Sequence, residues 1–169
     1  VELDCDLTKD YPVGEFHGSL RTRDSLGPLR FSEVIASPQV VDRTTSHVSK
    51  SVAEDFLISF QLRNDCLLQQ GGRMAHLQPG SFALYGSAEP YRLMFEKPFH
   101  QFILQISGSE LRRYISDPER LVGKTYAMDQ GFGPVARKFM YTLVNEQSTH
   151  QTADEGAIVR VRDTVSSLS

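Results

Sequence analysis

Cysteine is scarce in this sequence. The 169 residues include two cysteines, Cys5 and Cys66, far apart and with no CysXaaXaaCys pair. That spacing gives neither a metal nor a redox motif and is typical of a reducing compartment. Long apolar runs are also missing, and the N-terminal segment has neither the basic start nor the apolar core of a signal peptide. We therefore expect a cytoplasmic protein without a membrane partner.

Positive charge is neither in excess nor concentrated. The formal net charge is −3, the sequence pI is near 5.9, and the Lys and Arg residues are scattered along the chain. Nucleic-acid binders normally carry a basic patch or stripe, because they neutralise phosphates. This chain by itself is therefore not expected to bind DNA. Residue 1 is Val and not Met, so we expect the chain to be a part of a longer protein.

Motifs for metal or nucleophilic catalysis are also absent. The five histidines form no HisXaaHis pair, and the positions just after Pro79-Gly80 are Ser81, Phe82 and Ala83, none of which is a His that could join a metal site. No GlyXaaSerXaaGly elbow occurs, and Cys66 lies inside an apolar strand. We predict no catalytic residue, no metal and no cofactor, and thus not an enzyme.

What the sequence does contain is a series of short apolar segments separated by turn signals. In residues 70–95 the signals are Gly71-Gly72, Pro79-Gly80 and the cluster at 86–90. Gly71-Gly72 predicts a tight hairpin, because glycine accepts the positive φ that a two-residue loop requires. The length and composition favour one principal domain, and closely spaced short strands are typical of a sandwich or small barrel.

About nine strands are predicted before residue 107. The strongest is 55–63, where Phe56, Ile58, Phe60 and Leu62 share one face and residues 57, 59, 61 and 63 share the other. Residues 46–54 are predicted to be a polar loop. The other predicted strands begin near residue 16, at 29 and at 40, flank Gly71-Gly72, and cover 82–85, 91–96 and 99–106.

The pattern changes to helical after residue 107. Ser107 and Glu110 have the spacing of a capping box, which predicts a short helix to about Ile115, and Asp117-Pro118 ends or restarts it. Pro134 is suitable for a first helical position, and an apolar face follows it to about Gln147. Thr152 and Glu155 predict a last helix, with an apolar stripe formed by Ile158, Val161, Val165 and Leu168. This stripe is about two heptads long, which fits either a helix packed on its own domain or the seam of a two-fold dimer.

Several of these segments together carry a family resemblance. They are the hairpin over residues 71–85, SerAlaGluProTyrArgLeu at 87–93, ProPheHisGlnPheIleLeuGlnIle at 98–106 and ValValAspArgThr at 41–45. Their order and spacing resemble the N-terminal sensor domain of AraC/XylS-family bacterial transcription regulators, over roughly residues 14 to 145. The resemblance implies a cupin-like (double-stranded β-helix) barrel with two to three α-helices after it, a small-molecule effector and a homodimer. It also implies DNA binding through a C-terminal helix-turn-helix domain that is not in this chain, and RNA polymerase as a partner of the whole protein.

On this basis we divide the chain into an N-terminal arm (1–14), an effector-binding barrel (15–107) and a helical dimerisation region (108–169). The barrel interior is the predicted pocket, apolar with a few polar groups that orient a ligand. Its candidate aromatic walls are Phe31, Phe60, Phe82, Tyr85, Tyr91 and Phe102, and its candidate polar groups are Arg43, His47, Gln61, Arg73 and His100. Each of these also fits plain core packing or a surface ion pair.

The predicted function is a ligand-sensing and dimerisation domain of a bacterial transcription activator. Arginines next to interior aromatic residues suggest an aromatic or amphipathic organic acid as the effector, since an unpaired cation in an apolar pocket is costly. Two alternatives remain from the sequence. One is a small cupin-type enzyme, and the other is a sensor domain that responds to a protein partner.

Overall fold

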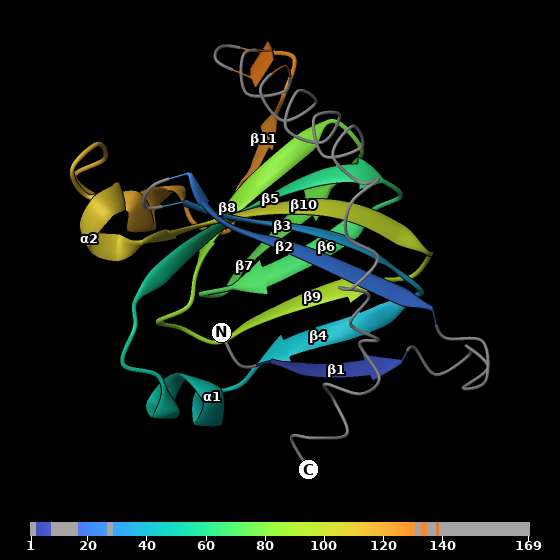
Figure 1. The fold of residues 1–169 in the computed structure, drawn as a ribbon, viewed down its shortest axis with the longest axis horizontal. Helices are drawn as coiled ribbons and strands as arrows, with labels where there is room; N and C mark the ends of the chain where they lie inside the picture. The colour runs from blue at the N-terminus through green and yellow to red at the C-terminus, as the bar shows by residue number, and fades with distance from the viewer. Residues whose placement is uncertain (1–2, 8–16, 27–28, 131–132, 135–137, 139–169) are drawn as a thin grey trace.

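The computed structural model describes residues 3–7, 17–26, 29–130, 133–134 and 138. Its strands form two antiparallel sheets that face each other (Figure 1). One sheet has the order β1(Asp4–Leu7), β4(Gln39–Arg43), β9(Tyr91–Phe95), β6(Cys66–Gln70), β7(Arg73–Leu77). The other has the order β11(Thr125–Ala127), β8(Ser81–Gly86), β5(Asp55–Arg63), β10(Phe99–Ser107), β3(Leu29–Ala36), β2(Gly18–Leu26). The prediction of a mainly β protein is confirmed.

The space between the sheets contains the main core. The inward residues of the five-stranded sheet alternate with outward ones, so Leu68, Leu77, Leu93 and Phe95 are buried against the partner sheet. Leu57 on β5 packs into the same cluster from the six-stranded sheet. Strands in which buried residues alternate regularly with more exposed ones are typical of a sheet with one buried face.

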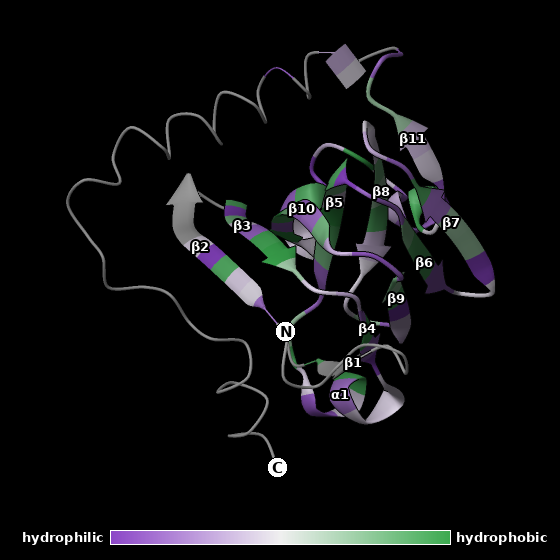
Figure 2. Ribbon diagram, turned by 90° about the vertical axis from the view of Figure 1, so that its right-hand side faces the viewer, coloured by the Kyte–Doolittle hydropathy of each residue, from purple (hydrophilic) through white to green (hydrophobic). Residues whose placement is uncertain are grey.

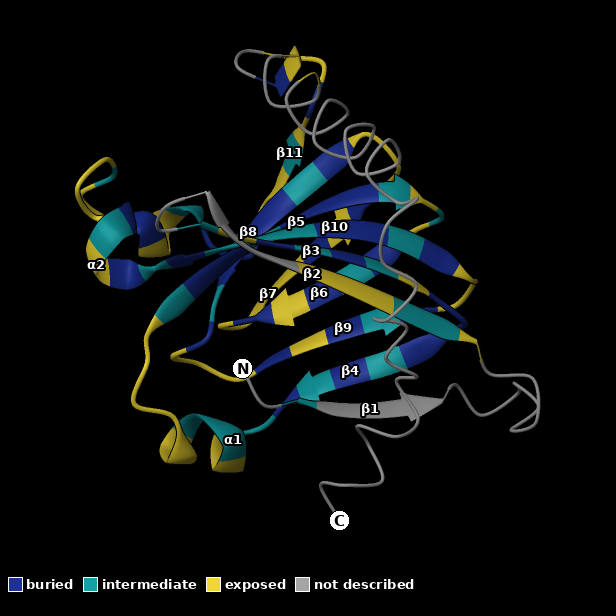
Figure 3. Cartoon of the chain, in the orientation of Figure 1, coloured by how far each residue is buried: buried dark blue, intermediate teal, exposed yellow. Residues whose placement is uncertain are grey.

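The six-stranded sheet is apolar on its outer face as well. Phe31, Phe60 and Phe102 are buried there in one cluster, and Phe56 and Leu84 are buried in a neighbouring one. Directly opposed residues in antiparallel strands lie on the same face, which places Phe102, Phe60 and Phe82 in one row. Figure 3 shows mostly buried and half-buried residues along β5, β8 and β10, and Figure 2 shows hydrophobic residues in the neighbouring strand β3.

The predicted hairpin at Gly71-Gly72 is confirmed. β6 pairs with β7 from Gln70 and Arg73 onward, and the two glycines between them have φ values of 57° and 73°. Both values lie in the left-handed region that a type I′ loop needs. The hairpin forms one end of the five-stranded sheet, and the functional candidates described below gather at that end.

Two short helices differ from the sequence prediction. α1(Thr45–Lys50) replaces part of the polar loop expected at 46–54. Because the helix buries none of its residues, its sequence has no apolar stripe from which a helix could be predicted. α2(Gly108–Leu111) begins where predicted, with the Ser107 hydroxyl accepting a hydrogen bond from the Glu110 N–H, but ends four residues before Ile115. The Glu110 carboxylate pairs with Arg113, three residues on.

A segment from 118 to 128 follows α2 and returns to the sheets. The 3-10 helix η2(Pro118–Leu121) restarts the helical path after Asp117, and β11 then adds to the edge strand β8. The Met128 N–H donates to the Gly80 carbonyl, and the Thr125 hydroxyl donates to the His76 carbonyl. These contacts fasten the segment to both sheets.

The remaining predictions for the C-terminal part lie outside the described residues. They include the apolar face up to Gln147, the Thr152 cap, and the stripe of Ile158, Val161, Val165 and Leu168. Gly133, Pro134 and Lys138 have helical backbone, in agreement with a helix that starts at Gly133-Pro134. At the other end, part of the predicted arm is strand β1, which pairs with β4 in the sheet.

Candidate functional site

Four polar or aromatic residues form one row across the five-stranded sheet, at its hairpin end. Arg43 on β4 is opposite Tyr91 on β9, Tyr91 is opposite Gln70 on β6, and Gln70 is opposite Arg73 on β7. Opposed residues share a face, and this face is the inner one. Arg43 is 1% exposed and Gln70 is 2% exposed, so a charged and an amide side chain are buried at the end of the core.

Arg43 and Gln70 hold the β8–β9 turn. The Gln70 amide donates to the carbonyls of Gly86 and Glu89, at 2.7 and 3.1 Å, while its Oε1 accepts from the Gly86 N–H. Arg43 Nε donates to the Ser87 carbonyl at 2.7 Å. The main-chain groups of this turn thus find their partners in side chains from two other strands.

Arg73 at the other end of the row extends to the 3-10 helix. Its Nη1 donates to the main-chain carbonyl of Val122 at 2.8 Å and lies 3.4 Å from that of Glu119. Arg73 thereby connects the edge strand β7 to η2. The row as a whole joins the β4–β9–β6–β7 sheet, the β8–β9 turn and η2.

A cavity of about 380 Å³ opens at this end of the two sheets. We call it the end pocket. Its walls come from the start of β5, the β6–β7 hairpin, the β8–β9 turn and η2 (Figure 1). Its lining residues are Glu54, Phe56, Gln70, Gly71, Arg73, Gly86, Ala88, Glu89, Glu119 and Val122. The volume lies in the range usual for small-molecule sites.

Arg112, just after α2, lies beside the end pocket and contacts residues of its wall. Its Nη2 is 2.8 Å from Glu54 Oε1 and also pairs with the Glu119 carboxylate. The guanidinium lies over the Phe56 ring, with Cζ 5.6 Å from the ring centroid. The two carboxylates raise the pKa of Arg112, with the Glu54 hydrogen bond as the first cause. Two elements of the pocket wall, the start of β5 and η2, are thus held by one cation.

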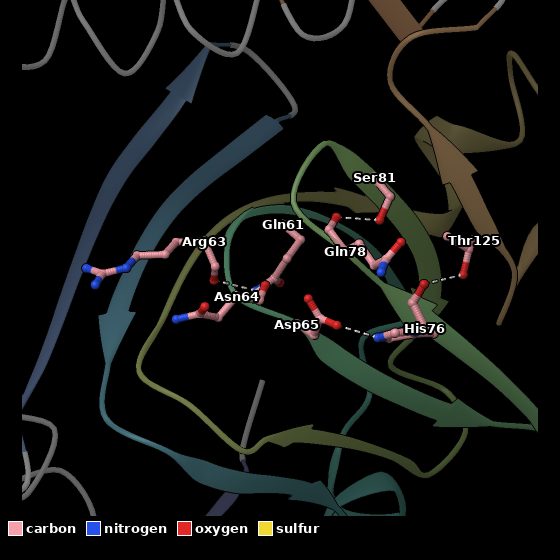
Figure 4. Close-up of polar contacts among 8 residues, drawn as sticks. All are labelled: Gln61, Arg63, Asn64, Asp65, His76, Gln78, Ser81 and Thr125. Atoms are coloured by element: carbon pink, nitrogen blue, oxygen red, sulfur yellow. Dashed lines mark hydrogen bonds and ion pairs between the residues drawn. The ribbon is translucent and has the colours of Figure 1, made fainter.

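Deeper between the sheets, polar side chains satisfy each other in pairs. The Ser59 and Tyr85 hydroxyls are 2.8 Å apart, and Gln101 Nε2 donates to Gln61 Oε1 at 2.9 Å. Gln61 in turn donates to the Arg63 and Asn64 carbonyls (Figure 4). Burial raises the pKa of the Tyr85 hydroxyl and raises that of the Cys66 thiol to about 12. These groups are therefore neutral in the core and offer hydrogen bonds but no charge.

A second cavity, also of about 380 Å³, lies on the outer face of the five-stranded sheet. Its floor includes Leu67 and Met94, and at its side His76 Nε2 is 2.7 Å from Asp65 Oδ2 (Figure 4). Both side chains of this pair are about half exposed, at 51% each. An exposed pair of this kind contributes little binding energy, so we place the candidate site at the end pocket.

The structure divides the predicted site residues into separate groups. Arg43, Tyr91 and Arg73 share the row at the end pocket, and Tyr85 and Gln61 lie deeper on the inner faces. The four phenylalanines, however, lie on the outer face of the six-stranded sheet, so they do not share one wall with Tyr85 and Tyr91 as expected. They are Phe31, Phe60, Phe82 and Phe102.

The two predicted histidines are not at the pocket either. His47 Nδ1 lies 3.1 Å from the main-chain N of Thr44, where it caps α1. His100 pairs with the buried Glu33 at 2.8 Å, on the outer face. Conversely, the sequence did not predict the pocket residues Gln70, Glu54 and Glu89, or Arg112 beside the pocket. A buried glutamine at the end of an alternating strand was a usable signal for Gln70.

Neither a metal-binding cluster nor a membrane-spanning helix is present in the part of the chain that the structure describes. Among the residues that the structure describes, no three or more His, Cys, Asp or Glu side chains are grouped so that they could hold a metal ion. Within the same residues, no helix has the length and apolar character needed to cross a membrane.

Comparison with known proteins gives the family. The sequence profile of the AraC-binding-like domain matches residues 3–168. The chain belongs to this family. The chain is also similar to the "Uncharacterized protein in nit 5'region" of Bacillus sp. (strain OxB-1), with 43% identity over 111 residues. That match covers 66% of this chain and 42% of the Bacillus protein, so the chain corresponds to less than half of that relative.

A solved structure shares the fold over most of the chain. The AraC-like transcriptional activator CuxR superposes with a TM-score of 0.77 at 14% identity, over 90% of this chain and 55% of the CuxR chain. A cupin domain of an XRE family transcriptional regulator from Enterobacter cloacae has a TM-score of 0.44 at 13% identity, over 53% of this chain and 95% of that one. The AraC-binding-like chain thus shares its fold with about half of a transcription activator.

Proposed function

We propose that this AraC-binding-like chain is the small-molecule sensing and dimerisation domain of a cytoplasmic bacterial transcription regulator, and not an enzyme. An effector binds at the end pocket, and its presence is transmitted to a C-terminal helix-turn-helix domain of the parent protein. The observation that carries the proposal is the position of the pocket. It lies where the ends of both sheets meet η2, the element that leads toward the C-terminal part of the chain.

The contacts around the end pocket support transmission. Arg73 links β7 to η2, and Arg112 links the start of β5 to η2. A molecule in the pocket touches the hairpin, the β8–β9 turn and η2 at the same time. A ligand that prefers one position of η2 shifts the population toward that position, by as much as its affinity differs between the two.

The domain division accompanies this proposal. Residues 15–107 form the effector-binding barrel, residues 1–14 the arm and residues 108–169 the dimerisation region, with Ile158, Val161, Val165 and Leu168 at the dimer seam. In the parent protein, DNA and RNA polymerase are partners through the other domain. Tyr85 and Gln61 are buried deeper on the inner faces and lie outside the lining of the end pocket.

A reporter assay with the parent regulator tests the proposal. Native mass spectrometry of the 169-residue chain against a metabolite panel first identifies a binder, which must also raise the unfolding temperature. Ala88→Trp fills the end pocket, and Ala127→Trp, at an exposed position on β11, is the control. We expect the first variant to lose binding and reporter response and the second to keep both. An unaltered response of Ala88→Trp would contradict the proposed site.

A further inference from the structure

We propose that the end pocket selects a small organic cation, a primary amine or guanidine on a short apolar body. This inference rests on the proposed function and names the ligand class of the same pocket. It replaces the organic acid that the sequence suggested. That suggestion depended on Arg43 and Arg73 offering their charge to a ligand, and the structure shows where their guanidinium groups are directed.

Both arginines of the row already donate to main-chain carbonyls around the pocket. Arg43 Nε is bound to Ser87 O, and Arg73 Nη1 is bound to Val122 O. An anionic ligand at Arg73 would compete with the Val122 carbonyl for this guanidinium. Both arginines thus already share part of their charge with carbonyl oxygens of the chain itself.

The protein itself holds a cation at the pocket wall. The Arg112 guanidinium lies over the Phe56 ring, 5.6 Å from the centroid, and is paired with Glu54 and Glu119. Phe56, Glu54 and Glu119 also line the end pocket. An aromatic face flanked by carboxylates is an arrangement that binds ammonium and guanidinium groups. This resident guanidinium shows that the wall accommodates a positive charge.

Glu89 supplies the carboxylate for a ligand. It lies on the β8–β9 turn, and its Oε2 is 3.5 Å from the position that a Cβ on Gly71 would occupy, so it stands over the hairpin at the pocket. Among the described residues, no cation or hydrogen-bond donor pairs with this carboxylate, whereas Glu54 and Glu119 are paired with Arg112. Phe56, Val122 and Ala88 provide the apolar surface for the body of the ligand.

Three probes of the same shape decide the ligand class. Benzylamine, benzamide and benzoate share one ring and differ in charge, and each is titrated into the ¹⁵N-labelled 169-residue chain. We expect benzylamine to bind most tightly and to shift the amide signals of Gly71, Gly86 and Ala88. Glu89→Gln keeps the shape of the side chain and removes its charge, so it should weaken benzylamine by about fivefold, the effect of one partly exposed ion pair. Glu96→Gln, at the second cavity, is the matched control and should have no effect.

The outcomes separate this inference from the proposed function. Tighter binding of benzoate than of benzylamine at the same amide signals would overturn the cation class and leave the end pocket as the effector site. Equal benzylamine affinity in the wild-type and Glu89→Gln chains would also overturn it. If none of the probes shifts any of these amide signals, the cation class is also rejected. The proposed function fails separately, if Ala88→Trp leaves the reporter response intact.

Discussion

Arg73 on β7 donates a hydrogen bond to the main-chain carbonyl of Val122, 49 residues later in the chain, over 2.8 Å. It is the shortest described link between the edge of the five-stranded sheet and the segment that leads toward the C-terminal part. Val122 is buried, and its N–H bonds back to Glu119 at the end of η2. This guanidinium is therefore one of the contacts that hold η2 against the sheets, together with Arg112.

Replacing Arg73 should destabilise the chain through this link. Arg73→Met keeps an unbranched apolar side chain but removes the donor, and we expect a loss of about 1 kcal/mol in the free energy of unfolding, the size of one hydrogen bond after discounting for its exposure. Urea unfolding followed by circular dichroism measures the loss. Arg63→Met is the control, because the Arg63 side chain is exposed and points away from the polar contacts in Figure 4. Equal stability of the two variants would contradict the role of Arg73.

Gly123 and Gly72 form a matched pair for a second prediction. Both have a left-handed φ, 68° and 73°, but a Cβ at Gly123 would lie 3.1 Å from the Arg73 Cβ, whereas a Cβ at Gly72 would meet nothing within 4 Å. Alanine at either position is strained by about 1 kcal/mol. Gly123→Ala should lose about 1 kcal/mol more than Gly72→Ala, because its neighbours must also shift. Thermal or urea unfolding of the two variants gives the difference, and equal losses would show that the strand–segment contact is not tight.

The Ser59–Tyr85 pair leads to a third prediction. Ser59→Ala leaves the buried Tyr85 hydroxyl without its partner, and we expect a loss of about 1–3 kcal/mol in unfolding free energy. Tyr85→Phe should be less harmful, because the smaller Ser59 group can turn toward the backbone of its own strand. The double variant should recover part of the sum of the two losses, so the cycle gives a coupling energy. Strict additivity would mean that the two hydroxyls do not bond.

The alternation of the strands was predictable, but the side of the sheet that each face takes was not. The pattern places Phe56, Ile58 and Phe60 together, and they do share a face. Because β5 is buried on both faces, hydrophobicity alone does not distinguish the inner face from the outer one. The polar residues 59 and 61 fall on the inner face, and there they pair with Tyr85 and Gln101.

The end pocket was only partly predictable for a related reason. Arg43 and Arg73 are candidates from the sequence because a cation that faces an apolar cavity would select a carboxylate or hydroxyl. The register of three strand pairs places them in one row. Gln70 and Arg112 act through partners that are 16 and 58 residues away in the sequence. No local pattern specifies such a partner, because only the packing of the sheets and α2 brings the groups together.

The buried thiol and phenol make stability fall at high pH. Burial raises the pKa of Cys66 from 9.0 to about 12 and raises that of Tyr85 as well. In the unfolded chain both groups ionise at their ordinary pKa values, so above about pH 9 the unfolded state loses protons that the folded state keeps. The stability is therefore complete below pH 9 and is lost as the pH rises toward 12, by up to about 1.4 kcal/mol per pH unit for each group. Urea unfolding at several values between pH 8 and 11 measures the slope. Cys66→Ala should show a smaller slope than the wild-type chain, and an unchanged slope would show that the Cys66 thiol ionises as readily in the folded chain as in the unfolded one.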